Sequence, residues 1–349
     1  MYWIIGGDAF LDELSKLTHN DAIRGVCMQF IDHMPWAGFR YYDMIFPLFL
    51  FIIGTTLPFS VGRRLEEGES RKSLVRKILI RAAILWAFGM IYNGALTAPS
   101  WDHVRIVGVL QRQGFGYACA GLIYLYCKPK AQIWIGIGIL LGYWALMAFG
   151  PVPGVPHGTY TEWGNFANYI DRQIFAPHQM YEKYGDPEGP VSMIPAIATA
   201  LIGLLAGQWL RSSRPEEKKS LGLLVAGLAC LALGLAWSPL FPIIKKIWTS
   251  SYVLFAGGMS LLLLAGFHWI IDVKGWWKWS FPFIVIGMNP ITIYMLTAVV
   301  DFTSIATHFV GGVANRLPDE KQAILAGSTL LVEWLLLYFL YKRKIFLKI

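Results

Sequence analysis

The chain has 349 residues, of which 56% are hydrophobic and only 15% are charged. Soluble domains carry about 25% charged residues, and a water-soluble fold could not bury this much apolar surface. Composition therefore excludes a soluble enzyme, a nucleic-acid-binding domain and a disordered chain, although the formal net charge is +8. The basic residues form short clusters between apolar runs, which is typical of the loops of a membrane protein. The four cysteines show no metal-ligand spacing, so we expect no metal site.

Nine runs are long and apolar enough for a membrane-spanning helix, which needs about 20 residues. In chain order they are 43–62, 74–96, 105–127, 131–150, 191–211, 219–239, 250–273, 281–300 and 324–342. The opening run 1–7 is too short to cross, lacks the basic start of a signal peptide, and is expected to be the exit end of a helix that begins upstream. We predict an all-α, polytopic membrane bundle of about ten spans, the first incomplete, forming a single domain over 1–349.

The distribution of basic residues predicts the orientation of these spans. Most of the 30 Lys and Arg residues fall on alternate connections, and the positive-inside rule makes that side cytoplasmic. Residues 8–42, 151–190 and 301–323 then face outward, and Lys245–Lys246 is the one basic pair on the outer side. The loop 151–190 is the longest connection, and loops of this length are usually lids or binding loops.

His33 precedes the span that begins near Asp43. An imidazole titrates near neutral pH and can accept a proton from an amine or a hydroxyl group. Asp43 is close enough in sequence to orient the ring. The alternative interpretation is an interfacial histidine beside Trp36, which is a common arrangement at membrane edges.

Arg105 and Arg112 are separated by nearly two helical turns, so both guanidinium groups share one helix face. Gln111 accompanies them. An arginine pair inside a bundle suits a phosphate group, because the planar guanidinium binds phosphate through two hydrogen bonds. The alternative is a structural ion pair with Asp102, Glu333 or another acid.

Three further polar groups lie at or inside predicted spans. Asp186 and Glu188 precede the span at 191 and could bind a sugar amine or favour the positive end of the helix dipole. The hydroxyl groups of Trp248–Tyr252 could bond a polar ligand, or Thr249 could cap the following helix. Asn289 could face a ligand or form a hydrogen bond between helices.

Taken together, these runs resemble the heparan-α-glucosaminide N-acetyltransferase family and its bacterial relatives, over nearly the whole chain. The resemblance is carried by His33-x-x-Trp36-x-Gly38 followed by Asp43 and Phe46-Pro47, by Arg105–Arg112, by Asp186–Gly189, by Lys246–Tyr252 and by Gly287–Asn289. It implies a membrane acyltransferase that moves the acetyl group of cytosolic acetyl-CoA to a glucosamine-like amino sugar on the outer side. The active-site histidine of the family matches His33, which the predicted orientation also places outside.

The resemblance implies roles for the candidate residues. His33 would be the general base or a transient acetyl carrier, oriented by Asp43. Arg105, Arg112 and Gln111 would hold the phosphates of CoA. The residues expected to line the acceptor site are Asp186, Glu188, Trp248, Tyr252 and Asn289.

The expected setting is the bacterial inner membrane, with acetyl-CoA as co-substrate and no metal. The partners would be a small amino sugar, the lipid bilayer and, as one option, a second copy of the chain in a homodimer, but no nucleic acid. Two alternatives stay open: a transporter of sugars or lipid-linked glycans without chemistry, and an O-acetyltransferase of an exported polysaccharide. A transporter needs neither the base His33 nor a phosphate clamp, whereas the O-acetyltransferase differs only in its acceptor.

Overall fold

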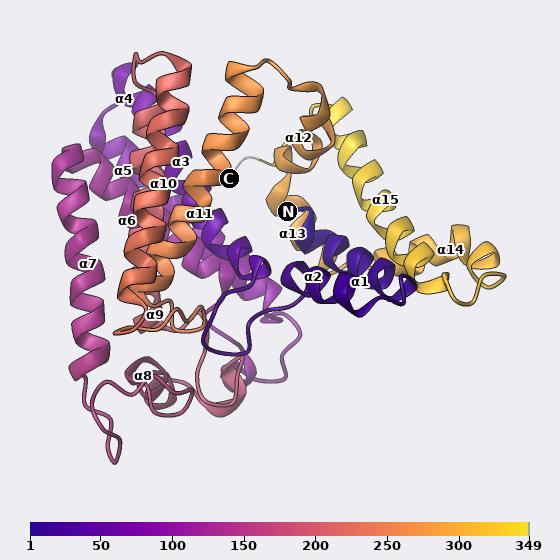
Figure 1. Ribbon diagram of the computed structural model, residues 1–349, viewed down its shortest axis with the longest axis horizontal. Coiled ribbons are helices and arrows are strands. Elements are labelled where there is room, and N and C mark those ends of the chain that lie inside the picture. The colour runs from indigo at the N-terminus through magenta and orange to yellow at the C-terminus, as the bar shows by residue number, and fades with distance from the viewer. Residues whose placement is uncertain (348–349) are drawn as a thin grey trace. The chain divides into compact units, whose positions relative to one another are not determined.

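The computed structural model describes residues 1–347 as helices and their connections, with no strand in that range (Figure 1). Within residues 1–347, six helices are long and apolar enough to cross a membrane: Tyr41–Glu66, Pro129–Phe149, Pro190–Leu210, Glu216–Trp237, Ser250–Val273 and Lys321–Lys342. A seventh results if the bent pair Lys278–Met288 and Pro290–Thr297 forms one span. The all-α class is thereby confirmed, whereas a total of about ten spans stays a prediction.

The chain divides into two compact units, which are described separately. Unit 1 comprises Met1–His33, Arg40–Tyr42 and Trp276–Ile349, and unit 2 comprises Met34–Phe39 and Asp43–Gly275. His33 and Asn289 therefore belong to unit 1. The other expected site residues all belong to unit 2.

Unit 2 contains most of the predicted spans. Its helices are α3 (Ile45–Leu57), α4 (Arg63–Glu66), α5 (Arg71–Tyr92), α6 (Val109–Tyr126), α7 (Pro129–Phe149), α8 (Phe166–Ile174), α9 (Pro190–Leu210), α10 (Glu216–Trp237) and α11 (Ser250–His268). Helix α6 begins only at Val109, so Arg105 precedes it in a non-helical segment, and the prediction that Arg105 and Arg112 share one helix face is wrong. The side-chain amide of Asn93 binds the backbone carbonyls of Arg105 and Val107 at 3.0 Å and 2.8 Å, which holds this segment outside the helix. Helices α5 and α6 cover most of the predicted spans 74–96 and 105–127 but are less apolar than the six above. The reason is that basic side chains lie inside α5, and polar side chains form the first turn of α6.

Helices α3 and α9 of unit 2 pack backbone against backbone. A Cβ atom at Gly54 would lie 1.9 Å from the carbonyl oxygen of Ala200, and one at Gly203 would lie 1.9 Å from that of Phe51. Small residues permit such close approach between membrane helices, where contact between the helices replaces the hydrophobic effect. Helices α10 and α11 lie side by side in the same way, with Gly227 against Gly258 (Figure 1).

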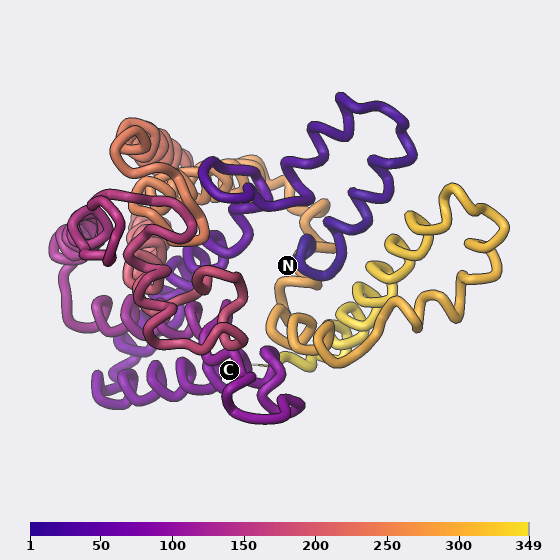
Figure 2. Tube along the Cα trace, turned by 90° about the horizontal axis from the view of Figure 1, so that it is seen from below, coloured from indigo at the N-terminus to yellow at the C-terminus, as the bar shows by residue number. Residues whose placement is uncertain are grey.

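Unit 1 begins with a kinked segment, Trp3–Gly7, in which Ile5 and Gly6 have non-helical backbone angles. It is followed by the helical hairpin of α1 (Asp8–Leu17) and α2 (Asp21–Ile31) that Figure 2 shows. Its C-terminal part contains α12 (Phe281–Met288), α13 (Pro290–Thr297), α14 (Phe302–Ala314) and α15 (Lys321–Lys342). The core of this unit is formed by Ile5, Val285, Ile286, Ile293, Phe302 and Leu337.

The predicted span 281–300 is not one straight helix. Helices α12 and α13 are bent by 61° at Asn289. Pro290 provides the physical reason, because proline has no N–H group to continue the hydrogen-bond ladder of the preceding helix. The break leaves backbone N–H and C=O groups without partners in the helix, and Asn289 is the residue at this break.

Candidate active site

His33 lies two residues beyond the end of α2 and is half-buried. The centroid of its ring is 4.5 Å from that of Tyr42, and its carbonyl oxygen accepts a hydrogen bond of 3.1 Å from Arg40. Arg40 also forms an ion pair of 2.8 Å with Asp32. These contacts within unit 1 fix the backbone of His33 and one side of its ring, which favours a positioned base.

Asp43 is fully buried in unit 2. Its Oδ2 accepts a hydrogen bond of 3.2 Å from the backbone N–H of Met34, the residue that follows His33. Its Oδ1 lies 3.6 Å from the ammonium group of Lys245. The hydroxyl group of Tyr252 donates to the backbone carbonyl of Asp43 over 2.7 Å. Asp43 therefore anchors the segment that continues from His33, and its orientation of the imidazole ring stays a prediction.

Two backbone contacts hold the same segment against the rest of unit 2. Gly38 donates its N–H to the carbonyl of Ile243 over 2.8 Å, next to a bridge between Ala37 and Ile244. The indole N–H of Trp36 donates to the carbonyl of Tyr160 over 2.8 Å. The sequence H-x-x-W-x-G thus has a structural explanation: the tryptophan is a donor to the loop 151–190, and the glycine has a φ of 118°, which a side chain rarely allows.

Lys245 belongs to the cluster of residues that contact Asp43, and the sequence analysis gave it no role in the site. Its side chain is 14% exposed and belongs to the connection between α10 and α11. Burial lowers the pKa of Lys245 to about 8, against the opposing attraction of Asp43 and Glu188. The available signal was its place on the predicted outer side, where basic residues are otherwise rare.

Arg105 is engaged by two carboxylates. Its Nε and one terminal nitrogen bind Asp186 at 2.7 Å and 2.6 Å, and that terminal nitrogen also binds Glu188 at 2.5 Å. The Asp186 side chain is fully buried. The structure thus contains the structural ion pair that the sequence analysis left open, and it brings together two predicted groups that had been assigned to different ligands.

Arg112 is buried, with its guanidinium carbon 4.3 Å from the centroid of the Trp248 ring. One terminal nitrogen donates to the carbonyl of Pro187 and to the hydroxyl oxygen of Ser192. Its Nε has no hydrogen-bond partner among the described residues, and neither has Oε1 of the neighbouring Gln111. Buried polar atoms without a partner are rare, and contact with a ligand is one way to satisfy them.

The start of α11 is built around Trp248, which is fully buried. Its φ is 51°, a left-handed conformation that is uncommon outside glycine and that concentrates at functional sites. Its indole N–H donates to the hydroxyl group of Thr199 over 3.1 Å. Thr249 caps α11 by accepting the N–H of Tyr252 over 3.4 Å, which confirms the capping alternative for this residue.

Asp171 of α8 is a second group that the sequence analysis missed. Its Oδ2 accepts the N–H of Asp186 over 3.0 Å, whereas its Oδ1 has no partner among the described residues. Burial raises the pKa of Asp171 to about 7. No motif marked this residue, because it approaches Asp186 only once the loop 151–190 has folded onto the start of α9.

Asn289 belongs to unit 1. Its Nδ2 donates to the carbonyl of Ile345 over 3.0 Å, and its Oδ1 accepts the N–H of Leu347 over 3.1 Å. The side chain thus joins the break between α12 and α13 to the segment after α15. Both partners lie in a non-helical segment, so these bonds are not the hydrogen bond between helices that the sequence analysis gave as the alternative. Contact of Asn289 with a ligand stays a prediction.

No protein-family model matches the chain. Curated proteins similar to it include the heparan-alpha-glucosaminide N-acetyltransferases of Mus musculus and Homo sapiens, each 30% identical over 380 aligned residues. Each alignment covers 92% of this chain and 56% of the relative, so the chain spans about half the length of the curated relatives it matches. Similarity over 92% of this chain confirms its resemblance to the heparan-α-glucosaminide N-acetyltransferase family.

Proposed function

We propose that this chain is a membrane acyltransferase that moves an acetyl group from cytosolic acetyl-CoA to the amine of a glucosamine-like sugar on the outer side of the membrane. The observation that carries the proposal is the similarity to two N-acetyltransferases over 92% of the chain. The buried cluster around Asp43 and Arg112 supports it, because charged groups inside a membrane bundle are costly and usually functional.

The chemistry assigns one task to His33. The acceptor amine must lose a proton as its nitrogen attacks the thioester carbon, the C–S bond then breaks, and the CoA thiolate takes up a proton. His33 would accept the proton of the amine as a general base. In the alternative route the imidazole nitrogen of His33 attacks the thioester carbon, the C–S bond breaks and CoA leaves as its thiolate. The amine then attacks the acetyl-imidazole, the C–N bond to the ring breaks, and the freed imidazole takes up the proton that the amine loses.

Asp43 and Lys245 would act as positioning residues. The carboxylate of Asp43 holds the N–H of the residue that follows His33, and Lys245 supplies the opposite charge 3.6 Å from this buried carboxylate. A buried charge pair of this kind stays in place only while both partners are charged. The position of the backbone next to His33 therefore depends on the charge of Lys245.

The donor site is proposed at Arg105, Arg112 and Gln111. Arg112 supports this assignment, because its Nε has no acceptor within residues 1–347 and the guanidinium group binds phosphate well. Arg105 would have to share its charge with Asp186 and Glu188. The same pairing bears on the acceptor, since a sugar amine at these two carboxylates would compete with Arg105.

Trp248 and Tyr252 would complete the acceptor site of unit 2, and contact of Asn289 with a ligand stays a prediction. We propose the bacterial inner membrane as the location, with His33 on the outer face and about ten spans. The alternation of basic connections supports this orientation. A homodimer is the proposed option for assembly.

Mass spectrometry of the purified protein with acetyl-CoA and a panel of sugars tests the function. We expect one acetyl group to be gained by glucosamine, with release of CoA, and no reaction with N-acetylglucosamine, whose nitrogen is already blocked. A transporter would leave acetyl-CoA intact with every sugar. An O-acetyltransferase would also acetylate sugars that lack an amine.

A further inference from the structure

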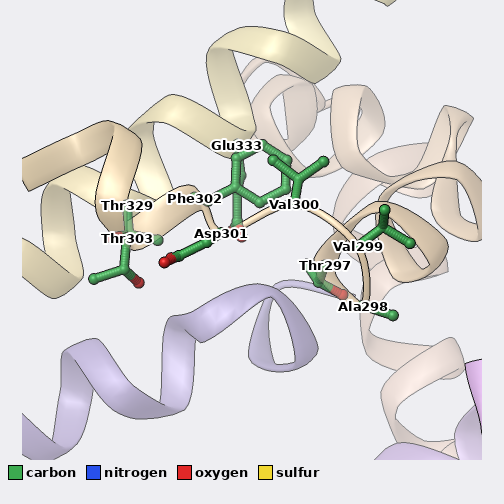
Figure 3. Close-up of a pocket in the computed structure, with 9 residues that line it drawn as sticks. All are labelled: Thr297, Ala298, Val299, Val300, Asp301, Phe302, Thr303, Thr329 and Glu333. Atoms are coloured by element: carbon green, nitrogen blue, oxygen red, sulfur yellow. The ribbon is translucent and has the colours of Figure 1, made fainter. Parts of the chain in front are cut away.

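Unit 1 contains a cavity of about 390 Å³ outside the cluster described above. It is lined by Thr297–Thr303, the connection from α13 to α14, and by Thr329 and Glu333 of α15 (Figure 3). Cavities that bind small molecules typically have volumes of about 300–1,000 Å³. The cavity is therefore large enough for a monosaccharide.

Glu333 gives this cavity its charge. The residue is only 3% exposed, and its Oε2 has no hydrogen-bond partner among the described residues. Figure 3 shows the side chain extending from α15 toward the connection that carries Asp301. Because α15 is one of the six candidate spans, this carboxylate lies in a helix where ionisable groups are costly and mark functional sites.

Most of the remaining polar groups of the cavity are acceptors, and the hydroxyl group of Thr303 can donate or accept. Asp301 is a second carboxylate, which also caps α14 by accepting the N–H of Ser304 over 3.0 Å. The hydroxyl protons of Thr297 and Thr329 are donated to carbonyl groups within their own helices, at 2.9 Å each. Toward a ligand in the cavity, the hydroxyl oxygens of these two threonines can therefore act only as hydrogen-bond acceptors. No Lys, Arg or His is among the residues that line it.

A ligand that matches this lining must be positively charged and rich in donors. An ammonium group supplies a positive partner for the carboxylate of Glu333. Hydroxyl groups supply hydrogen-bond donors for the threonine oxygens and Asp301. We propose that this cavity binds a protonated amino sugar, with Glu333 as the counter-ion of its ammonium group. The choice of an amino sugar rests on the proposed function, whereas the need for an ammonium group rests on the cavity alone.

Equilibrium dialysis of the full-length protein in detergent, with labelled glucosamine, tests the proposal. We expect Glu333→Gln to remove one class of glucosamine sites, with its affinity at least about tenfold weaker, because hydrogen bonds to charged groups are the strong ones. Glu320→Gln is the matched control, since Glu320 is exposed, precedes α15 and lies outside the cavity. It should bind as the wild type does.

Two further measurements keep the result decisive. Ala298→Trp narrows the cavity from its exposed edge while both carboxylates remain, and it should weaken binding even if Glu333→Gln folds poorly. Ethanolamine, the amine of a common lipid headgroup, should compete more weakly than glucosamine, and glucose should not compete. Ethanolamine that competes as well as glucosamine would overturn the choice of a sugar.

The outcome is separable from that of the proposed function. Unchanged glucosamine binding in both cavity variants, with acetyl transfer intact, would overturn the inference and leave the enzyme assignment standing. If Glu333→Gln loses glucosamine binding but the wild-type protein transfers no acetyl group, the inference about the cavity stands and the proposed enzyme function is overturned.

Discussion

At the scale of single residues, the buried charges of unit 2 contact one another rather than solvent. Lys245 faces Asp43, and Arg105 faces Asp186 and Glu188. Removal of one partner leaves the other charge buried and uncompensated, which costs more than an exposed pair could contribute. Each of these residues therefore allows a test in which charge and shape are varied separately.

The charge of Lys245 is expected to set the upper pH limit of acetyl-transfer activity. Burial lowers the pKa of Lys245 to about 8, so the side chain is charged below that pH and loses its charge as the pH rises through it. We expect acetyl transfer to fall above pH 8 in the wild type. Lys245→Arg should move this fall to higher pH, because arginine stays protonated. Lys245→Met should be weakly active at every pH, and a wild-type pH profile in this variant would contradict the positioning role.

Substitution of His33 is expected to lower the rate of acetyl transfer without unfolding the protein. General-base catalysis is worth about 10²–10⁴-fold, so His33→Ala should lower turnover by at least about 100-fold. The melting temperature should change little, because the side chain is only half-buried. Affinity for acetyl-CoA should stay near that of the wild type.

A mass gain of one acetyl group on the peptide that contains His33, with acetyl-CoA alone, would identify the carrier route. Its absence with full turnover would identify the direct one. Full activity of His33→Ala on the best acceptor would remove this residue from the mechanism.

Arg105 and Arg112 predict different phenotypes. Arg105→Ala leaves Asp186 buried without its partner and should destabilise the protein by about 3–5 kcal/mol. Arg112→Ala should weaken CoA binding by about 1.5–3 kcal/mol if its free Nε contacts a phosphate group. Thermal unfolding and CoA binding of both variants separate the two effects. CoA affinity unchanged in the double variant would make both arginines structural.

The sequence could identify some of these residues and not others, for a physical reason. His33, Asp43 and Arg112 stand out because polar side chains are rare at the ends of apolar runs. The pairing of Arg105 with Asp186 joins positions 81 residues apart, and the carboxylate of Asp171 accepts the backbone N–H of Asp186. Such partners are set by the packing of the loop 151–190, which has no periodic pattern to follow.

At the scale of elements, hydropathy located the helices well because apolar length is what a bilayer requires. The helices α7, α9, α10, α11 and α15 begin and end within a few residues of the predicted spans. The break at Asn289 was less predictable, since Pro290 indicates a kink but not its size. The helical hairpin of α1 and α2 carries no spanning signal, so hydropathy gave no account of it.

The packing of α3 on α9 predicts an asymmetric response to glycine substitutions. Gly203→Ala places a Cβ atom 1.9 Å from the carbonyl oxygen of Phe51, so the two helices must separate. Overpacking of this kind costs about 1–3 kcal/mol or more. Gly138→Ala in α7 is the matched control, because its Cβ atom would meet nothing within 4 Å. We expect a lower melting temperature for Gly203→Ala alone, and equal melting temperatures would argue against backbone contact between these helices.

At the scale of the whole molecule, the distribution of basic residues is the strongest argument for the orientation of the chain in the membrane. Basic residues occupy alternate connections, and those connections are predicted to be cytoplasmic. The proposed function uses the same arrangement, with acetyl-CoA as a cytosolic donor and the acceptor outside. Orientation and function therefore support each other, and an experiment on one also tests the other.

The four cysteines allow that orientation to be measured. Cys27 lies in α2, within the predicted outward segment 8–42, and its side chain is partly exposed. Cys127 lies at the end of α6, on a connection predicted to be cytoplasmic. A membrane-impermeant maleimide added to intact cells should label Cys27, and Cys27→Ser should abolish the signal. Permeabilised cells should then show labelling of Cys127. Labelling of Cys127 in intact cells would reverse the orientation, place His33 on the cytoplasmic side, and exclude acetyl transfer across the membrane by the proposed route.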